Sequence, residues 1–169
     1  HIVIETSLGE IELELYPEKA TQTVAAFLQH IESGVYEQTY FYRVLKADEL
    51  PSDYNTGIIQ GGLWQVNSGK DKLINKIPHE STLQTGMLHT DGVISMARQD
   101  SGTASTEFFI CIGNQPAFNY GKSANHDRQG YAAFGVVLKG MSVVRKIHAK
   151  KSHGDRFDEK IEIRNISKK

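Results

Sequence analysis

The chain has 169 residues, of which 39% are apolar and 23% are charged, and its formal net charge is -1. This length suffices for one domain with a full hydrophobic core. The near-neutral charge gives no electrostatic support for general binding to nucleic acid or to an anionic membrane, and no apolar stretch is long enough for a membrane span.

The first predicted element is a β-hairpin. Residues 1–6 alternate between apolar and polar positions, and residues 10–16 do so again, with a tight turn at Ser7-Leu8-Gly9. Such alternation is typical of strands with one buried face. The side chains expected in the core are Ile2, Ile4, Ile11, Leu13 and Leu15.

Four apolar side chains at helical spacing then predict an amphipathic helix. They are Val24, Phe27, Leu28 and Ile31. We expect Thr21 or Thr23 to cap the start of this helix. Gly34 suits the left-handed residue just past its end.

A strand is predicted at residues 40–45, whose odd positions are apolar except for Arg43. The polar residues 46–57 are typical of a surface loop. A short apolar strand follows at 58–60, and the two glycines after it let the backbone bend or approach another group closely. Residues 67–92 are polar and carry few signals of regular structure.

The second half of the chain predicts four more strands and a second helix. The strands are expected at 93–97, 108–112, 131–138 and 159–166, and the helix at 141–148. Many short strands with two helices are typical of an antiparallel sheet closed into a barrel, with helices at its ends. We therefore expect an all-β fold in a single domain over residues 1–169.

The usual catalytic groups are missing from the sequence pattern. No two of the seven histidines have metal-site spacing, and His79, His89 and His126 lie in polar loops where we expect them to be exposed. The one cysteine, Cys111, excludes an intrachain disulfide and is expected to be a buried thiol. The sequence predicts no metal and no cofactor, and it argues against hydrolase and phosphotransferase chemistry.

Arg43 is the charged residue that most needs an explanation. An arginine is always charged, so a buried one must be paired or used. If Arg43 faces a cleft with Gln60 beside it, the two side chains offer hydrogen-bond donors to a neutral carbonyl or amide. They offer no nucleophile and no obvious proton shuttle.

Five segments, in order along the chain, resemble the cyclophilins, a family of peptidyl-prolyl cis–trans isomerases. They are Phe41-Tyr42-Arg43-Val44, Gln60-Gly61-Gly62, Ser95-Met96-Ala97-Arg98, Glu107-Phe108-Phe109-Ile110, and Ala133-Phe134-Gly135-Val136-Val137 with Gly140-Met141. The Met-Ala-Arg form resembles the bacterial branch. The resemblance implies a closed eight-stranded antiparallel barrel capped by two α-helices, in agreement with the elements above.

The resemblance also implies a site. Arg43 would be the catalytic arginine and Gln60 its catalytic neighbour, and Glu107 would lie in the substrate-binding site. Ala97 and Arg98 would meet the substrate backbone through their own main chain. The proline pocket would be lined by Ile58, Phe109 and Phe118, with Tyr131 at its rim.

Three places depart from the family pattern. They are Gly57-Ile58 in place of Phe and Met, Glu107 in place of Gln, and Phe118-Asn119 in place of an aromatic residue and Leu. The last change would remove one apolar wall of the pocket. The segments 46–55 and 122–129 are also longer than in most relatives.

Two alternatives stay open for Glu107. If its carboxylate faces the cleft, it can pair with Arg43 and compete with the substrate for that donor, which would slow the reaction or favour cationic residues near the proline. Otherwise the carboxylate turns outward or is satisfied by a nearby backbone donor.

Two functions are compatible with these residues. The first is an isomerase acting on proline-containing peptides and unfolded protein chains. The alternative, which the departures favour, is a cyclophilin-like peptide-binding or chaperone module with low or no turnover. We expect a monomer, and weak binding of cyclosporin-type ligands because Phe118 replaces the more common Trp. The start at His1 and the resemblance to exported bacterial members slightly favour a periplasmic or otherwise extracytoplasmic location.

Overall fold

The structure is a computed structural model that describes residues 1–46, 57–63, 74–99, 101–122 and 126–169. The elements of the first half are β1 (Ile2–Thr6), β2 (Gly9–Leu15), α1 (Thr21–Glu32), β3 (Thr39–Lys46), β4 (Gly57–Gly62) and α3 (Thr82–Thr85). Those of the second half are β5 (Val93–Met96), β6 (Phe108–Ile112), η2 (Pro116–Phe118), β7 (Ala132–Lys139), α4 (Met141–His148), β8 (Ser152–His153) and β9 (Arg156–Lys168). Most of the long segment 46–55 and part of 122–129 lie outside the described residues.

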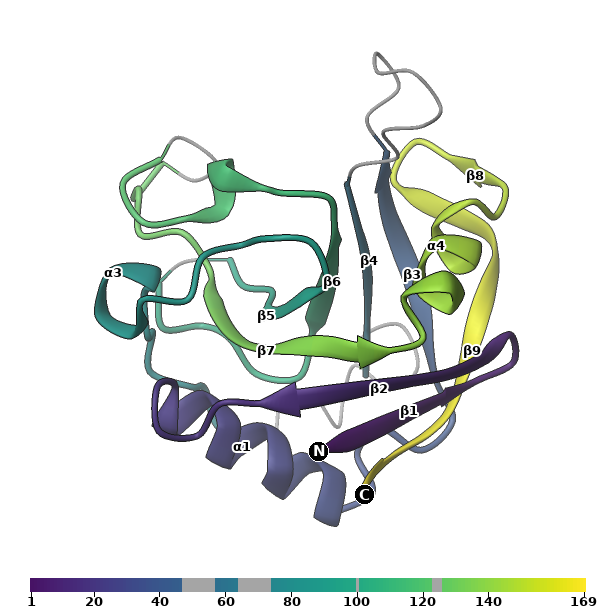
Figure 1. Ribbon diagram of the computed structural model, residues 1–169, viewed down its shortest axis with the longest axis horizontal. Coiled ribbons are helices and arrows are strands. Elements are labelled where there is room, and N and C mark those ends of the chain that lie inside the picture. The colour runs from purple at the N-terminus through teal and green to yellow at the C-terminus, as the bar shows by residue number, and fades with distance from the viewer. Residues whose placement is uncertain (47–56, 64–73, 100, 123–125) are drawn as a thin grey trace.

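Eight strands form a closed antiparallel barrel (Figure 1). Their order is β1-β2-β7-β5-β6-β4-β3-β9, and β1 pairs with β9 to close the ring. The short strand β8 continues the sheet beyond β9. Helix α1 packs against β7 and β9, and helix α4 packs against β2, β4 and β6. The predicted barrel with two capping helices is therefore confirmed. Among the described residues, no helix is long and apolar enough to cross a membrane.

The main core contains a network of contacting aromatic rings among its aliphatic side chains. These rings belong to Phe27, Tyr36, Phe41, Phe108 and Phe134. Successive side chains of a strand point to opposite faces. Strand β6 therefore places Phe108 in the main core and Phe109 in a second apolar cluster with Ile58 and Cys111.

Strand β3 contains a bulge at Tyr42. The register of β3 shifts between Phe41 and Arg43 against both neighbouring strands, β4 and β9. Phe41 and Val44 are consequently both buried in the main core, whereas Arg43 and Leu45 line a pocket outside it. Regular alternation would put Arg43 on the same face as Phe41, and the bulge is the reason that it does not.

Other elements differ from the sequence prediction in their ends. The last strand begins at Arg156, three residues earlier than predicted, because it forms a hairpin with β8. The polar stretch 67–92 contains helix α3, which was not predicted. Ser81 and Gln84 form a reciprocal capping box at its start, and this box stabilises so short a helix.

Helix α1 is capped from a distant segment. Its N-cap residue is Ala20, so the predicted cap by Thr21 or Thr23 is wrong. Instead, the Glu80 carboxylate accepts hydrogen bonds from the backbone N–H of Gln22 at 3.3 Å and of Thr23 at 2.7 Å. The Thr23 hydroxyl donates to the same carboxylate at 2.6 Å and is therefore not available as a cap. The predicted Gly34, just past the helix end, does have a left-handed φ of 72°.

We predict that Glu80→Ala lowers the free energy of unfolding by about 1–2 kcal/mol, because two N–H groups at the start of α1 lose their acceptor and the helix dipole loses a favourable charge. Urea denaturation followed by circular dichroism measures this change. Glu18→Ala, which removes an exposed carboxylate just before the same helix, is the matched control. Equal stability of the two variants would contradict the remote cap.

Candidate active site

A single row of cross-strand neighbours carries the core of the site. Arg43 of β3 pairs with Gln60 of β4, Gln60 pairs with Phe109 of β6, and Phe109 pairs with Ser95 of β5. In this row Arg43 Nη1 donates to Gln60 Oε1 at 2.8 Å. The register of the barrel thus brings together two residues that lie 17 positions apart in the sequence.

An apolar pocket of about 260 Å³ opens beside this row. Its aromatic walls are Phe109, Phe118 and Tyr131, whose ring centroids lie 5.4 Å from one another in edge-to-face arrangements. The other residues that line it are Arg43, Leu45, Ile58, Gln60, Ala97 and Arg98. The structure therefore gathers in one pocket every residue predicted for the site except Glu107, and it adds Leu45.

Leu45 fills a wall for which the sequence offered no candidate. Gly57 has a φ of 147°, and a Cβ atom there would lie 1.8 Å from the Leu45 carbonyl oxygen, so this position requires glycine. A phenylalanine side chain at position 57 is excluded by that contact. Leu45 packs instead against the Ile58–Phe109 cluster, and His148 Nε2 donates to its carbonyl at 2.9 Å. The signal for Leu45 was its position two residues after Arg43 on the same strand.

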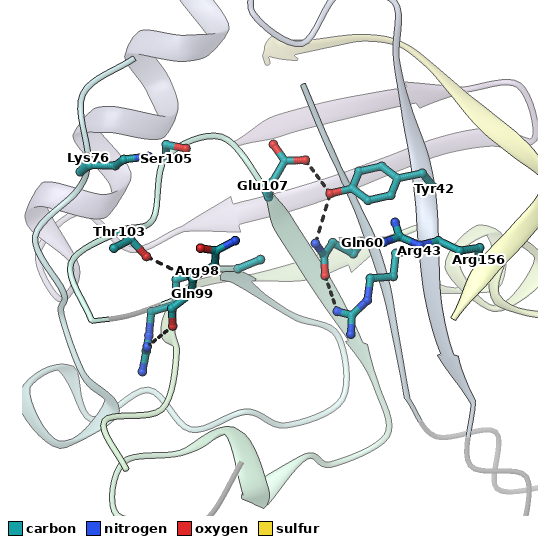
Figure 2. A pocket seen from close by; sticks show the side chains of 11 residues that line it. Tyr42, Arg43, Gln60, Lys76, Arg98, Gln99, Thr103, Ser105, Glu107 and Arg156 are labelled. Carbon is teal, nitrogen blue, oxygen red and sulfur yellow. Dashed lines mark hydrogen bonds between the residues drawn. The ribbon is translucent and has the colours of Figure 1, made fainter. Parts of the chain in front are cut away.

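Glu107 lines a second cavity, of about 410 Å³, which shares Arg43 and Gln60 with the first (Figure 2). Its Oε1 accepts a hydrogen bond from the Tyr42 hydroxyl at 2.6 Å, and its Oε2 accepts one from the backbone N–H of Leu63 at 3.1 Å. The Thr106 hydroxyl donates to Oε2 as well. Glu107 is thus held by nearby donors, as in the second alternative considered for it, although it does face a cavity.

Tyr42 links Glu107 to Arg43 through Gln60. Gln60 Nε2 donates to the Tyr42 hydroxyl at 3.2 Å, while Gln60 Oε1 accepts from Arg43 (Figure 2). Burial and the adjacent Glu107 carboxylate raise the pKa of Tyr42, so its hydroxyl stays protonated and donates to Glu107. No role was predicted for Tyr42, because the bulge that turns it toward Gln60 leaves no pattern in the sequence.

The ion pair of Arg43 is made with Asp155. Arg43 Nε donates to Asp155 Oδ2 at 2.9 Å, and the Arg43 side chain keeps 32% of its surface exposed. This hydrogen bond is the main cause that lowers the pKa of Asp155. Within the described part of the chain, Arg43 Nη2 has no hydrogen-bond partner, so the guanidinium still has donors to offer to a bound molecule.

The Arg98 side chain is used structurally. Only 1% of it is exposed, and its two Nη atoms each lie 3.0 Å from an oxygen of Asp127, whose pKa is lowered to about 2 by this pairing. Arg98 Nε also donates to the Gly130 carbonyl at 2.9 Å. These bonds hold the segment that leads to Tyr131 against the end of β5. The contact of substrate with the Arg98 main chain stays a prediction.

Comparison with known proteins identifies the family to which this chain belongs. The family model of the cyclophilin type peptidyl-prolyl cis-trans isomerase/CLD matches residues 1–168. The chain belongs to the cyclophilin family. A peptidyl-prolyl cis-trans isomerase of Acinetobacter baylyi is 33% identical, over 86% of this chain and 70% of that protein. Peptidyl-prolyl cis-trans isomerase A of Dickeya dadantii is 34% identical, over 87% of this chain and 70% of that protein.

The fold of this cyclophilin is also found in solved structures. A cyclophilin type isomerase of Cryptosporidium parvum, crystallised in the presence of the dipeptide Ala-Pro, superposes with a TM-score of 0.76 at 22% identity. The alignment covers 98% of this chain and 96% of that one. At this identity the likeness concerns the fold. The isomerase class and the bacterial resemblance follow from the family match and the bacterial relatives.

His89 of this cyclophilin lies behind the aromatic pocket, and the expectation that it is exposed was wrong. It is 1% exposed, and its ring stacks on Phe109 with the centroids 6.0 Å apart. His89 Nδ1 lies 2.8 Å from Asn119 Oδ1 and Nε2 lies 2.8 Å from Ser95 Oγ. Because an amide oxygen only accepts, Nδ1 carries the proton and Nε2 accepts from Ser95. Asn119 thus anchors the ring behind the pocket.

The two other histidines predicted to be exposed differ from each other. His126 is exposed as predicted, whereas His79 is half-buried.

We predict that protonation of His89 destabilises this cyclophilin. Burial lowers the pKa of His89 to about 4, whereas the unfolded chain titrates near its ordinary value of about 6.5. Between these two values the unfolded state binds a proton that the folded state excludes. The free energy of unfolding therefore falls as the pH is lowered from about 6.5 to 4, by about 3 kcal/mol for this group.

Urea denaturation at several pH values tests this dependence. His89→Gln should flatten the decrease between pH 6.5 and 4, whatever its stability at neutral pH. His126→Gln, which removes an exposed histidine, should keep the full decrease. Identical slopes in the two variants would contradict the prediction.

We predict that Glu107→Gln lowers the free energy of unfolding by about 1–3 kcal/mol, because one amide oxygen replaces two carboxylate oxygens that accept from three donors. Chemical denaturation measures the difference in unfolding free energy from the wild type, and Glu159→Gln, at an exposed position of β9, is the control. A faster isomerisation in Glu107→Gln, with unchanged stability, would instead show that Glu107 competes for Arg43.

Proposed function

We propose that this cyclophilin accelerates rotation about X-Pro amide bonds in peptides and unfolded chains, with Arg43 as donor to the prolyl nitrogen. The observation that carries this proposal is the place of Arg43. It lines both the apolar pocket and the polar cavity beside it, with donors still available in the described structure. A chain that lies across both cavities brings one amide bond over this guanidinium.

The chemistry of the reaction fits such a site. Rotation about an amide bond has a barrier of roughly 18–20 kcal/mol because the C–N bond has double-bond character. In the twisted transition state this conjugation is lost, and the prolyl nitrogen becomes a better hydrogen-bond acceptor. A fixed cationic donor aimed at that nitrogen stabilises the twisted form more than either planar isomer. No bond breaks, so the reaction needs no nucleophile or cofactor.

The apolar pocket supplies the second requirement, a fixed proline ring. Its three aromatic walls and Ile58 offer an apolar surface for a pyrrolidine ring, and a bound chain that excludes water from the pocket would strengthen the hydrogen bond from Arg43. Ala97 and Arg98 line both cavities, a position from which their main chain could hold the extended chain. The ring stays still while the residue before it rotates.

The three departures from the family pattern leave this arrangement usable. Leu45 provides a wall in place of the residue missing at Gly57, Glu107 is bonded to Tyr42, and Asn119 turns toward His89. None of these changes occupies Arg43. For this reason the hypothesis that the protein is a binding or chaperone module with little turnover is treated as one outcome of the test below and is not a second proposal.

We predict that Arg43→Ala slows X-Pro exchange about 100-fold at saturating peptide, as expected for loss of one preorganised donor in a transition state. Exchange NMR on a short proline-containing peptide gives the rate, and a titration of the same peptide gives its affinity. Arg164→Ala, an exposed arginine on β9, serves as control and should match the wild type. If the wild type binds the peptide but exchanges it no faster than Arg43→Ala, the protein is a binding module.

A further inference from the structure

Arg43 belongs to a closed ring of five contacting side chains. Arg43 donates to Gln60, Gln60 donates to Tyr42, and the guanidinium of Arg156 lies over the Tyr42 ring with its central carbon 5.6 Å from the centroid. Asp155 closes the ring, with Oδ2 2.9 Å from Arg43 Nε and Oδ1 3.5 Å from Arg156 Nε. Arg43 is therefore held by contacts on two sides.

Asp155 separates two arginines that the fold places opposite each other. Arg43 and Arg156 are direct cross-strand partners between β3 and β9. Like charges in such a pair repel each other and would drive the two guanidinium groups apart. With one carboxylate oxygen toward each arginine, Asp155 offsets that repulsion and keeps Arg43 beside Gln60.

The backbone around Asp155 fixes the carboxylate in place. Gly154 and Asp155 form the two-residue turn between β8 and β9, whose flanking residues His153 and Arg156 are paired. The carbonyl of Asp155 also accepts the backbone N–H of Val44, the residue after Arg43, at 2.9 Å. The carboxylate is thus tied to β3 through its own main chain, and it is not carried by a loose loop.

We propose that Asp155 is a positioning residue for the isomerase reaction: it fixes Arg43 Nε so that the guanidinium presents its remaining donors to the bound amide. A planar guanidinium held at Nε and Nη1 has a defined plane and direction, which leaves Nη2 as the donor for substrate. This inference rests on the proposed role of Arg43. It assigns a function in catalysis to a turn that lies 112 residues away from Arg43 in the sequence.

The position of Asp155 argues for a role in geometry more than in stability. The side chain is 43% exposed, and exposed ion pairs contribute little to the free energy of folding. A misplaced donor, by contrast, costs much of its catalytic effect. Loss of Asp155 should therefore change the catalysed rate while the thermal midpoint stays close to that of the wild type.

The experiment combines Asp155→Asn with Arg43→Ala in a double-mutant cycle. Exchange NMR at saturating peptide should show a loss of about tenfold in Asp155→Asn, with an unchanged peptide dissociation constant. In the Arg43→Ala background, Asp155→Asn should have no further effect, because Asp155 acts through Arg43. Asp158→Asn, which removes an aspartate from the same hairpin without touching Arg43, should keep the wild-type rate.

The outcomes separate the two proposals. Equal rates in Arg43→Ala and wild type would refute the proposed function itself. A slow Arg43→Ala with a fully active Asp155→Asn would refute only the positioning role. The positioning role also fails if Asp155→Asn is faster than wild type, if its loss persists in the Arg43→Ala background, or if Asp158→Asn loses activity equally.

Discussion

The bulge at Tyr42 is the constraint on which the site depends. If β3 kept regular alternation through Tyr42, Arg43 would point to the same side as Phe41, into the main core. Burying a guanidinium there without a partner would cost far more than a bulge does. With the bulge, Phe41 and Val44 both stay in the core, and Arg43 lies beside Gln60 on the side of the sheet that lines the pocket. The bulge thus lets β3 bury its apolar side chains in the core while Arg43 lines the pocket.

The polar side chains of the site form one directed chain. Arg43 donates to Gln60, Gln60 donates to Tyr42, and Tyr42 donates to Glu107, so every donor points toward the same carboxylate. Such chains are mutually reinforcing in surroundings of low dielectric constant, and they are costly when one member is unsatisfied. Glu107 therefore acts on Arg43 indirectly, by fixing the orientation of the amide that contacts it. At the other end, Asp155 accepts a hydrogen bond directly from Arg43 Nε. The guanidinium is thus linked to two carboxylates, to Asp155 directly and to Glu107 through Gln60 and Tyr42.

Alternation in β1 and β2, short apolar runs at β5 and β6, and one buried face on each main helix were enough to predict the barrel. The sequence also brought Arg43 and Gln60 together, and the pocket contains the apolar residues expected beside them. The misses have a common physical origin in contacts between distant segments. Glu80 caps a helix at Gln22, 58 residues earlier in the chain, and buried His89 is hydrogen-bonded to Asn119, 30 residues further along the chain. Neither contact leaves a periodic pattern, and a bulge of one residue leaves none either.

The departures from the family pattern are better understood in pairs than singly. Gly57 has no side chain, and the adjacent Leu45 takes up the wall; its carbonyl approaches Gly57 so closely that no larger residue would fit. Glu107 brings a charge into the site, and Tyr42, Thr106 and the Leu63 N–H satisfy it. Asn119 brings an amide next to an apolar pocket, and His89 takes its oxygen away from the pocket. Each change is matched by a neighbour that removes its cost, because an unmatched polar group or void at these positions would destabilise the fold itself. A single unusual residue in an active-site motif is therefore poor grounds for assigning loss of activity until its partner in space is known.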